Sequence, residues 1–230
     1  MKTNFSLSGM PDFSPAEMHT RKHVISIIEA QFSTFGFSPI TTSLIEKRSN
    51  LFDSYGEDGE KLIFQILRSG DYLQKVEKAL DNLTSKTLSP LISDKSLRYD
   101  LTVPLTRYIA ENRSSINFPF RRYEIGSVFR ADRPQKGRLR QFTQCDADII
   151  GSQSLWLEID LLNLMGAVFN QLKLNSLVIR VSHRKVLEGV FKSFSSDLSF
   201  SKFCIIIDKL DKVGLDKVGE LLEDAGLSNK

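Results

Sequence analysis

Cysteine is scarce in this sequence of 230 residues, which contains only Cys145 and Cys204. Two cysteines so far apart are too few for a disulfide framework or a zinc knuckle. Both lie in apolar, strand-like runs, so we interpret them as buried thiols and not as redox or metal-binding residues. The composition therefore excludes a small domain held together by disulfide bonds.

Long apolar runs are absent as well. Hydrophobic residues make up 41% of the chain and charged residues 26%, and no apolar run approaches the roughly 20 residues that a membrane span needs. Residues 1–13 lack the apolar core and small-residue cleavage site of a secretory signal. We expect a soluble, cytoplasmic protein with one large domain and the start of a second.

A glycine-rich phosphate-binding loop is the third absence, since neither G-x-x-x-x-G-K-[ST] nor G-x-G-x-x-G occurs. If the protein binds a nucleotide, side chains must hold it. The net charge of +3 is small, but residues 121–140 carry +5 and the rest of the chain −2. Such a basic run is usually a solvated face, although arginine forks can also pair bidentately with phosphate oxygens.

What is present begins with a well-marked helix. Ser14 is suited to cap it, Pro15 to occupy its first position and Glu17 to complete a capping box, while Gly36 closes it. Further along we expect a strand over 37–46, a turn or hairpin over 55–61, a helix over 72–83, a polar connection over 84–95, and a strand from Leu97 leading into a helix with Thr102 near its N-cap.

The densest pattern predicts a long antiparallel hairpin. Residues 118–131 and 141–150 have the character of strands, and a polar, basic loop joins them. Because side chains alternate along a strand, the second strand has one polar side and one apolar, core-facing side. The polar side comprises Phe142, Gln144, Asp146 and Asp148, and the apolar side Cys145, Ala147 and Ile149. On the first strand, Glu124 and Arg130 share one parity.

After the hairpin we expect a second domain to begin. The pattern predicts a helix over 155–172, a strand over 177–181, a helix over 185–191 capped by Ser182, a strand from 203 and a final helix around Val218, Leu221 and Leu222. Serines interrupt the apolar pattern between 194 and 201, which predicts a domain over 1–195 and the start of another over 196–230. So small a piece rarely has a self-sufficient core.

The polar strand face has several interpretations on these residues alone. It could be an ordinary solvated face or the floor of a site for a small polar ligand, and Asp146 with Asp148 also matches a DxD element that chelates a divalent cation. His19 and His23 stand one helical turn apart but have no evident third metal ligand. If ATP binds, the arginine-rich hairpin is suited to hold it, with Phe142 as a stacking surface.

Several runs resemble one family. FRRYEIGSVFRADRPQKGRLRQFTQCDADIIG resembles motif 2 of class II aminoacyl-tRNA synthetases, in the form found in histidyl-tRNA synthetases. LRYDLTVPLTRYIA resembles the segment of these enzymes that holds the amino acid, and GMPDFSPAEMHTRKHV with FGFSPITTSLIE resembles their N-terminal helix and motif 1. SHRKVLEGVF and IIIDKLDKVG resemble the run into their insertion domain. The resemblance implies an α+β fold, with an antiparallel sheet flanked by helices.

The resemblance also implies a reaction and its nucleotide site. Histidine would be activated with ATP to histidyl-adenylate and transferred to tRNA(His). Arg130 would be the catalytic residue and contact the α-phosphate of ATP, Phe142 would stack on adenine, and Arg138 would approach the outer phosphates. Mg²⁺ would accompany ATP. Gln135 would face the acceptor end of the tRNA.

For histidine, the resemblance implies that Asp100, Thr102 and Gln144 hold the α-amino end and that Asp148 accepts a hydrogen bond from the imidazole. It further implies a homodimer. Ser43 stands where motif 1 usually has an interface proline, which puts the dimer geometry in question.

Other positions depart from the family pattern. Thr143 replaces a frequent histidine or tyrosine, and residues 66–95 have the length of an insertion. Nothing resembles motif 3, so we expect an incomplete catalytic domain that is inactive alone. A non-catalytic regulatory subunit of histidine biosynthesis, acting on ATP phosphoribosyltransferase, is the alternative.

Overall fold

The computed structural model describes residues 6–73, 76, 84–174, 176–196 and 198–228. The chain forms two compact units, Met1–Leu177 and Val178–Lys230. The boundary that we predicted between residues 195 and 196 lies within the second unit. In the described part of the chain, no helix combines the length and the apolar character that crossing a membrane requires.

The first unit begins with α1 (Pro15–Thr34), which has the predicted capping box. The Glu17 carboxylate accepts a hydrogen bond from the backbone N–H of Ser14 at 2.7 Å, and the Ser14 hydroxyl oxygen accepts one from the N–H of Glu17. Gly36 follows the helix with φ of +77°, a conformation that suits glycine. The expected first helix is therefore confirmed.

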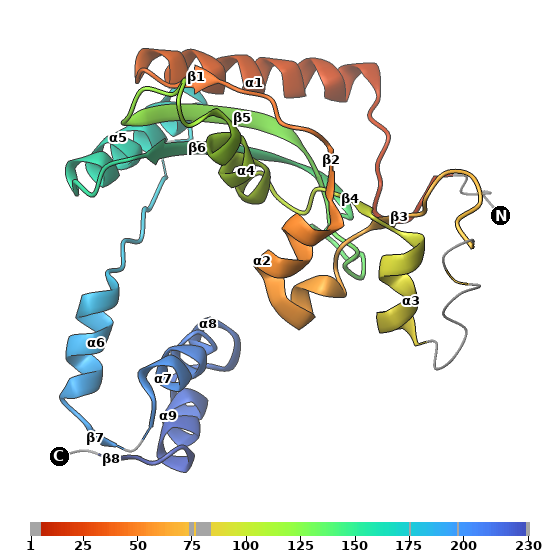
Figure 1. Cartoon of the computed structure of the whole chain (residues 1–230). Coiled ribbons are helices and arrows are strands. Elements are labelled where there is room, and N and C mark those ends of the chain that lie inside the picture. The colour runs from red at the N-terminus through yellow and green to blue at the C-terminus, as the bar shows by residue number, and fades with distance from the viewer. Residues whose placement is uncertain (1–5, 74–75, 77–83, 175, 197, 229–230) are drawn as a thin grey trace. The chain divides into compact units, whose positions relative to one another are not determined.

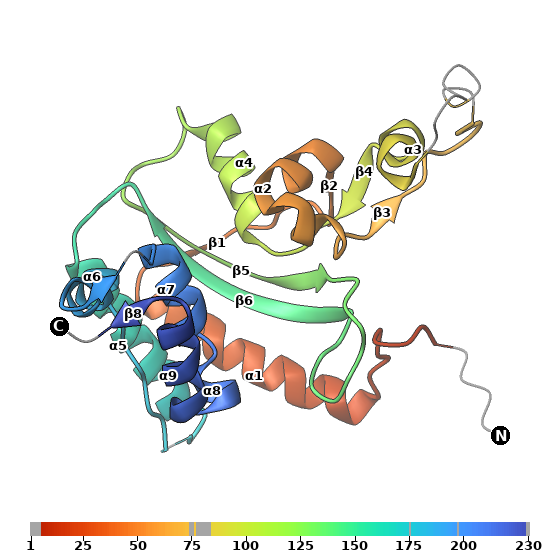
Figure 2. The same cartoon turned by 90° about the horizontal axis from the view of Figure 1, so that it is seen from below.

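A long antiparallel hairpin of β5 (Phe120–Phe129) and β6 (Gln141–Ile150) is the centre of this unit. β1 (Ser38–Pro39) pairs in parallel with β5, so that β6 lies at an edge of the sheet. α1 and α5 (Trp156–Gln171) cover one face of the hairpin, and α4 (Thr102–Asn112) lies on the other side (Figure 1 and Figure 2). The predicted antiparallel sheet flanked by helices is confirmed.

The apolar core lies between the hairpin and the helices α1 and α5. Its buried centre takes one side chain from each of four segments: Phe32, Phe37, Tyr123 and Leu164. Ala147 and Ile149 pack against this centre, which confirms the alternation predicted for β6. Thr143 faces the same side, where its hydroxyl accepts a hydrogen bond from Arg21 of α1 at 2.7 Å.

Neither cysteine is fully buried. Cys145 is exposed because it lies on the edge strand and lines an apolar cavity of about 450 Å³ between α1 and α5. Cys204 is half-buried and lies on a helix. Both are free thiols, as predicted, and Cys145 lies in a strand, but the predicted burial of both and the strand predicted for Cys204 are wrong.

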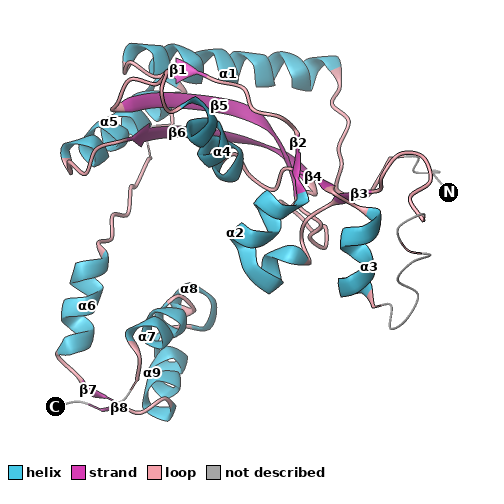
Figure 3. Cartoon of the chain, viewed as in Figure 1, coloured by secondary structure: helices cyan, strands magenta, loops and turns pink. Residues whose placement is uncertain are grey.

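A second, smaller sheet has the order β2-β4-β3 and is antiparallel throughout. Its strands are β2 (Ile45–Lys47), β3 (Gln65–Ile66) and β4 (Lys95–Leu97). Helix α2 (Arg48–Glu60) follows β2, and α3 (Ser85–Ile92) precedes β4 (Figure 3). Ser43 lies just before β2, where its hydroxyl donates to the carbonyl of Ile45 at 2.7 Å.

Residues 37–46 were predicted as one strand, but they form β1 and part of β2, which belong to different sheets. Between the two strands, the backbone N–H of Thr42 donates to the buried carboxylate of Glu124 and not to a neighbouring strand. A side chain from a distant segment therefore interrupts the strand.

Two helices replace a predicted turn and a predicted connection. Residues 55–60 belong to α2, because burial of Leu51 and Phe52 at its start outweighs the low helix propensity of its glycines. Thr84 caps α3 in a box completed by Thr87, where glutamate or glutamine is usual. The helix predicted over 72–83 lies mostly outside the described residues.

The second unit is mainly helical in its described part. It contains α6 (Arg184–Lys192), β7 (Ser195–Ser196), α7 (Phe200–Ile207), α8 (Leu210–Val213), α9 (Leu215–Asp224) and β8 (Leu227–Ser228). β7 and β8 pair with each other in antiparallel fashion. The final helix is confirmed as α9.

Three local predictions for this unit are wrong. Residues 177–181 form no strand, and the apolar run from 203 belongs to α7 because the Ser199 hydroxyl caps that helix. The rings of Phe200 and Phe203 also lie on one helix face, 5.7 and 5.1 Å from the ring of Phe191. Helix α6 is capped by Nδ1 of His183, not by Ser182.

A buried ion pair joins three segments of the first unit. Arg98 Nη1 lies 2.7 Å from Glu124 Oε1, and the two side chains are 3% and 2% exposed. The N–H and the hydroxyl of Thr42 each donate to the Glu124 carboxylate at 3.0 Å. Arg98 also donates to the carbonyls of Thr42 and Ser127. The pair therefore links the segment before β2, the end of β4 and the middle of β5.

Gly126 lies against this guanidinium, and a Cβ at this position would clash with Nη2 of Arg98. Because its hydrogen bonds hold the guanidinium in place, we expect Gly126→Ala to lower the free energy of unfolding by about 1–3 kcal/mol. Gly166→Ala in α5 is the matched control, since its Cβ would meet no atom within 4 Å. Equal urea midpoints for wild type and Gly126→Ala would contradict the expected clash.

Arg98→Met would leave Glu124 buried without a cation, and we expect it to lower the free energy of unfolding by about 3–5 kcal/mol. The double variant Arg98→Met/Glu124→Gln removes both charges and should recover part of that loss. Thermal melting of the single and double variants measures the difference. A double variant less stable than Arg98→Met would show that the charge of Glu124 is not the cause.

Candidate active site

The candidate site lies on the polar face of the β5–β6 hairpin, on the side of α4. The pairing register places Arg122 opposite Asp148, Glu124 opposite Asp146 and Gly126 opposite Gln144. These side chains share one face because alternate residues of a strand point the same way. The polar face predicted from the sequence is therefore present, and Arg122 and Glu124 belong to it.

Arg130 directly follows β5 at one end of this face. Its Nε donates to the carbonyl of Tyr99 at 3.2 Å. The guanidinium carbon lies 4.4 Å from the ring centroid of Tyr99 and 5.2 Å from that of Phe142. Two aromatic rings and a carbonyl thus hold the cation where one of its planar edges can meet an anion.

The loop between the strands adds basic side chains beside Arg130. Arg138 is 58% exposed, and its Nε lies 3.5 Å from the carboxylate of Asp132. A cavity of about 180 Å³ is lined by residues of the loop and the two strand ends: Arg130, Asp132, Gly137, Arg138, Leu139 and Phe142. The three predicted ATP-binding residues, Arg130, Arg138 and Phe142, therefore line one cavity.

Gln135 lies at the tip of the same loop. Its backbone pairs with that of Arg138 in a tight turn, which leaves its side chain exposed. At the base of the loop, the N–H groups of Arg140 and Gln141 both donate to the carbonyl of Gly9, at 2.7 and 3.0 Å. The segment before α1 thus holds the loop at its base.

Asp100 lies at the start of α4. Its Oδ1 accepts hydrogen bonds from the N–H groups of Thr102 and Val103, at 3.1 and 3.2 Å. Leu101 is the N-cap residue, and the Asp100 side chain, one residue earlier, caps the first two N–H groups of α4. Thr102, which we placed near the cap, is the exposed first residue of the helix. The cap leaves Oδ2 of Asp100 without a role in the helix.

Gln144 and Asp148 lie on the floor of the face. The side-chain oxygen of Gln144 is buried and accepts no hydrogen bond from the described residues. Asp148 pairs with Arg122, whose Nη2 lies 2.5 Å from Asp148 Oδ2. Two of the predicted histidine-binding residues thus lie on one strand, and each has a side-chain oxygen that can accept a hydrogen bond from a ligand.

Carboxylates outnumber cations at the centre of the face. Burial raises the pKa of Asp146, and the nearby carboxylates of Asp148, Asp100 and Glu124 raise it further, while Arg122 acts in the opposite direction. The negative charge of Asp100, just before α4, thus acts on Asp146 of β6. The arrangement favours a ligand with a positive charge, such as an ammonium group.

Tyr55 of α2 is a neighbour of the site that the sequence did not indicate. Its ring centroid lies 4.7 Å from that of Tyr99, and burial followed by the proximity of Asp100 raises the pKa of its hydroxyl. We had predicted a turn here, so nothing pointed to Tyr55. Arg122 could have been found, because it has the same strand parity as Glu124 and Arg130.

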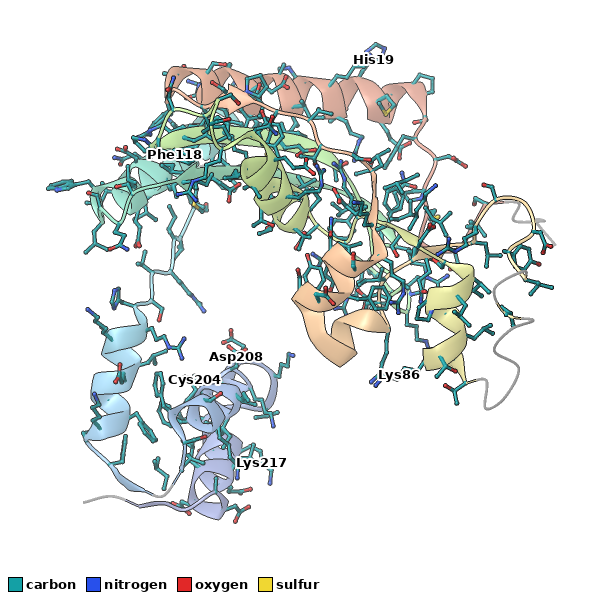
Figure 4. The ribbon with its side chains drawn as sticks, viewed as in Figure 1. His19, Lys86, Phe118, Cys204, Asp208 and Lys217 are labelled. Atoms are coloured by element: carbon teal, nitrogen blue, oxygen red, sulfur yellow. The ribbon has the colours of Figure 1, made fainter. Side chains whose placement is uncertain are left out.

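The metal interpretations gain no support from the geometry. In the parts of the chain that the structure describes, no three His, Cys, Asp or Glu side chains form a group that could hold a metal ion. His19 lies on the outer side of α1 and points away from the sheet (Figure 4). Asp148 of the DxD element pairs with Arg122 instead.

The face can therefore hold two kinds of group next to each other. Arg130, Arg138 and Phe142 form a cationic end with an aromatic ring, which suits a nucleotide. Asp100, Gln144 and Asp148 form an end with anionic and amide acceptors, which suits an ammonium group and a ring N–H. This combination matches the polar ends of an amino acid beside those of ATP.

Comparison with known proteins identifies the family. A family model described as histidyl-tRNA synthetase matches residues 9–228. The histidine–tRNA ligase of Christiangramia forsetii is 46% identical over 223 residues, which are 96% of this chain and 49% of that protein. That of Flavobacterium johnsoniae is 41% identical and matches 96% of this chain and 50% of that protein. The chain thus spans about half the length of these curated relatives.

Solved structures agree with this assignment. The histidyl-tRNA synthetase of Nostoc sp. PCC 7120 has a TM-score of 0.76 at 30% identity, covering 99% of this chain and 46% of that one. An ATP phosphoribosyltransferase regulatory subunit/histidyl-tRNA synthetase from Bacillus halodurans C has a TM-score of 0.73 at 18% identity, which shows a shared fold alone. Because the family model and the relatives match nearly all of it, the chain belongs to the histidyl-tRNA synthetase family, a family of class II aminoacyl-tRNA synthetases.

Proposed function

We propose that this chain provides the histidine and ATP site of an enzyme that makes histidyl-adenylate and transfers the histidyl group to tRNA(His). The observation that carries the proposal is the shared face of the β5–β6 hairpin. Arg130 lies at the proposed nucleotide end of this face, where its guanidinium approaches the rings of Tyr99 and Phe142. Asp148 lies further along the same face, and Gln144 lies between Phe142 and Asp148 on β6. Family membership supports the reaction, and this face supports the roles of the residues.

In the first step, an oxygen of the histidine carboxylate attacks the α-phosphorus of ATP. The bond between that phosphorus and the oxygen bridging to the β-phosphate breaks, and pyrophosphate leaves. Negative charge accumulates on the α-phosphate during the attack, so a guanidinium fixed in advance stabilises the transition state more than the ground state. Arg130 is the residue for this role, because Tyr99 and Phe142 already hold its guanidinium.

In the second step, a hydroxyl of the terminal ribose of the tRNA attacks the activated carbonyl carbon, and AMP leaves. Gln135 at the loop tip is exposed and is our candidate for contact with the acceptor end. The loop and its two ends, residues 130–140, contain five basic residues and one acidic residue, and this excess of positive charge favours the approach of a polyanion.

Mg²⁺ enters this proposal as the counter-ion of ATP. The described residues form no cage of three metal-binding side chains. Mg²⁺ commonly keeps several waters and binds through substrate phosphates with one or two carboxylates, so such a cage is not required. Asp132 lines the loop cavity and would be the carboxylate there that meets the ion.

We further propose that the protein acts in the cytoplasm as a homodimer, as the family resemblance implies, and that an isolated chain of this length is inactive. A regulatory subunit for ATP phosphoribosyltransferase is the competing function, since one structural neighbour has that description. The presence of Arg130, Arg138, Gln144 and Asp148 favours the enzyme, because a regulator does not need α-phosphate chemistry. Histidine-dependent exchange of pyrophosphate into ATP by the full-length protein tests between them.

Arg130→Ala should abolish most of that exchange. Loss of one preorganised donor to the developing charge lowers the rate by about 10²–10³-fold, while KM for histidine should change little. Arg113→Ala, an exposed arginine after α4, is the matched control and should exchange at the wild-type rate. Near-normal exchange by Arg130→Ala would remove Arg130 from the mechanism.

Asp100→Asn separates the charge of Asp100 from its role as a helix cap. Asparagine caps helices as well as aspartate does, so the melting temperature should stay the same. Loss of the negative charge beside the α-ammonium group should raise KM for histidine about tenfold or more. Asp94→Asn, which removes the exposed partner of Arg68, is the control. An unchanged KM for histidine would place the ammonium group elsewhere.

A further inference from the structure

The hydrogen bonds around Arg122 do not explain why its side chain is buried. Its side chain is 0% exposed, and it pairs with Asp148 across the strands at 2.5 Å. That contact is an ion pair and not a hydrogen bond, and within the described part of the chain none of the three guanidinium nitrogens has a hydrogen-bond partner. An arginine kept in the interior without hydrogen bonds destabilises the fold, so its presence needs a reason.

Arg98 shows what a structural arginine looks like on the same face. Its guanidinium donates to the carbonyl and hydroxyl oxygens of Thr42, to the carbonyl of Ser127 and to Glu124. Arg98 thereby holds segments together. Among the described residues, Arg122 forms an ion pair with a single side chain, the carboxylate of Asp148 that we assign to histidine recognition. The contrast points to a role in the site and not in the framework.

The two oxygens of Asp148 differ in their surroundings. Oδ2 is buried beside Arg122, yet the side chain as a whole is 35% exposed. The exposure must therefore come from the rest of the group, which includes Oδ1. One oxygen faces the buried cation, and the other is free to meet a ligand on the polar face.

We propose that Arg122 is a positioning residue for histidine recognition: it holds one oxygen of Asp148 in an ion pair, so that the other oxygen accepts the ring N–H of the substrate. This inference rests on the proposed function. Arg122 and Asp148 together carry no net charge, so the pair favours a neutral N–H donor over a fully cationic side chain. Arg122 would thus contribute to selection between histidine and the longer basic amino acids.

The charges around Asp148 agree with this role. On β6, Asp146 lies two residues before Asp148 on the same face, and on β5, Asp148 faces Arg122, with Glu124 two residues further along that strand. Asp100, which precedes α4, acts on Asp146. Glu124 is already paired with Arg98. Burial raises the pKa of Asp148, and Arg122 opposes that rise. Arg122 is therefore the cation that favours the ionised form of Asp148 against the effect of burial.

Arg122→Met tests the proposal in the full-length protein by histidine-dependent pyrophosphate exchange. Loss of a charge-assisted acceptor should raise KM for histidine about tenfold or more and leave KM for ATP nearly unchanged. The pKa of Asp148 should rise when the cation is removed. As the pH is lowered, the variant should therefore lose activity at subsaturating histidine at a higher pH than the wild type does. Free histidine titrates identically in every assay, so a displacement between variants belongs to the protein.

Arg121→Met is the matched control. Arg121 is the preceding arginine on β5, but it faces the other side and pairs with Asp160 of α5 at 2.6 Å. Its loss should change neither KM for histidine nor the acid limb. Arg122→Lys keeps the charge, so we expect it to retain most of the histidine affinity that Arg122→Met loses. Asp148→Asn combined with Arg122→Met should be no worse than Asp148→Asn alone, because both changes remove one interaction.

The outcomes separate the two levels of inference. Absence of histidine-dependent exchange in the wild-type protein would overturn the proposed function itself. If the wild type exchanges normally, two results would overturn only the positioning role. One is an equal loss of ATP and histidine affinity in Arg122→Met, and the other is an acid side of its pH profile that does not differ from that of the wild type. If Arg122→Met does not fold, two comparisons still decide. A KM for histidine in Arg122→Lys as high as in Asp148→Asn contradicts the proposal, and so does a double variant that is worse than Asp148→Asn alone.

Discussion

The buried ion pair of Arg98 and Glu124 is the interaction on which the arrangement of the first unit depends. It joins the end of β4 to the middle of β5 and takes in Thr42 from the segment before β2. Because Asp100 and Tyr99 follow Arg98 directly, the pair also sets where the α4 cap and the aromatic neighbour of Arg130 lie. Two charges in the interior are tolerated because nearly every donor and acceptor of the pair has a partner.

The site itself combines stable support with unsatisfied groups. The hydrogen bonds of Arg98 join segments of the framework. In contrast, Arg122, Gln144 and Asp148 have buried polar atoms that form no hydrogen bond with the described residues. Unsatisfied polar atoms oppose folding, and they concentrate where a ligand supplies the missing partners. A binding face of this kind requires a rigid frame beside it, which the neighbouring ion pair provides.

Much of the hairpin could be predicted from the sequence, because alternation along a strand is a local property. Phe142, Gln144 and Asp148 were assigned to one face, and Ala147 and Ile149 to the core, from spacing alone. The roles of Arg130 and Asp100 needed the family resemblance. The helix α2, and with it Tyr55, could not be predicted, because burial of Leu51 and Phe52 decides that segment. Long-range hydrogen bonds such as that of Thr42 to Glu124 leave no local pattern at all.

The unbroken pairing of β5 with β6 limits how related sequences can diverge. Ten residues of each strand face one another singly, from Phe120 and Ile150 to Phe129 and Gln141. Deletion of one residue from β6 before Asp148 would turn the positions beyond it to the opposite face and send Asp148 into the apolar layer under α1 and α5. Changes of chain length are therefore confined to the loop tip and to segments outside the hairpin, and within the two strands related sequences can differ only by exchange of side chains.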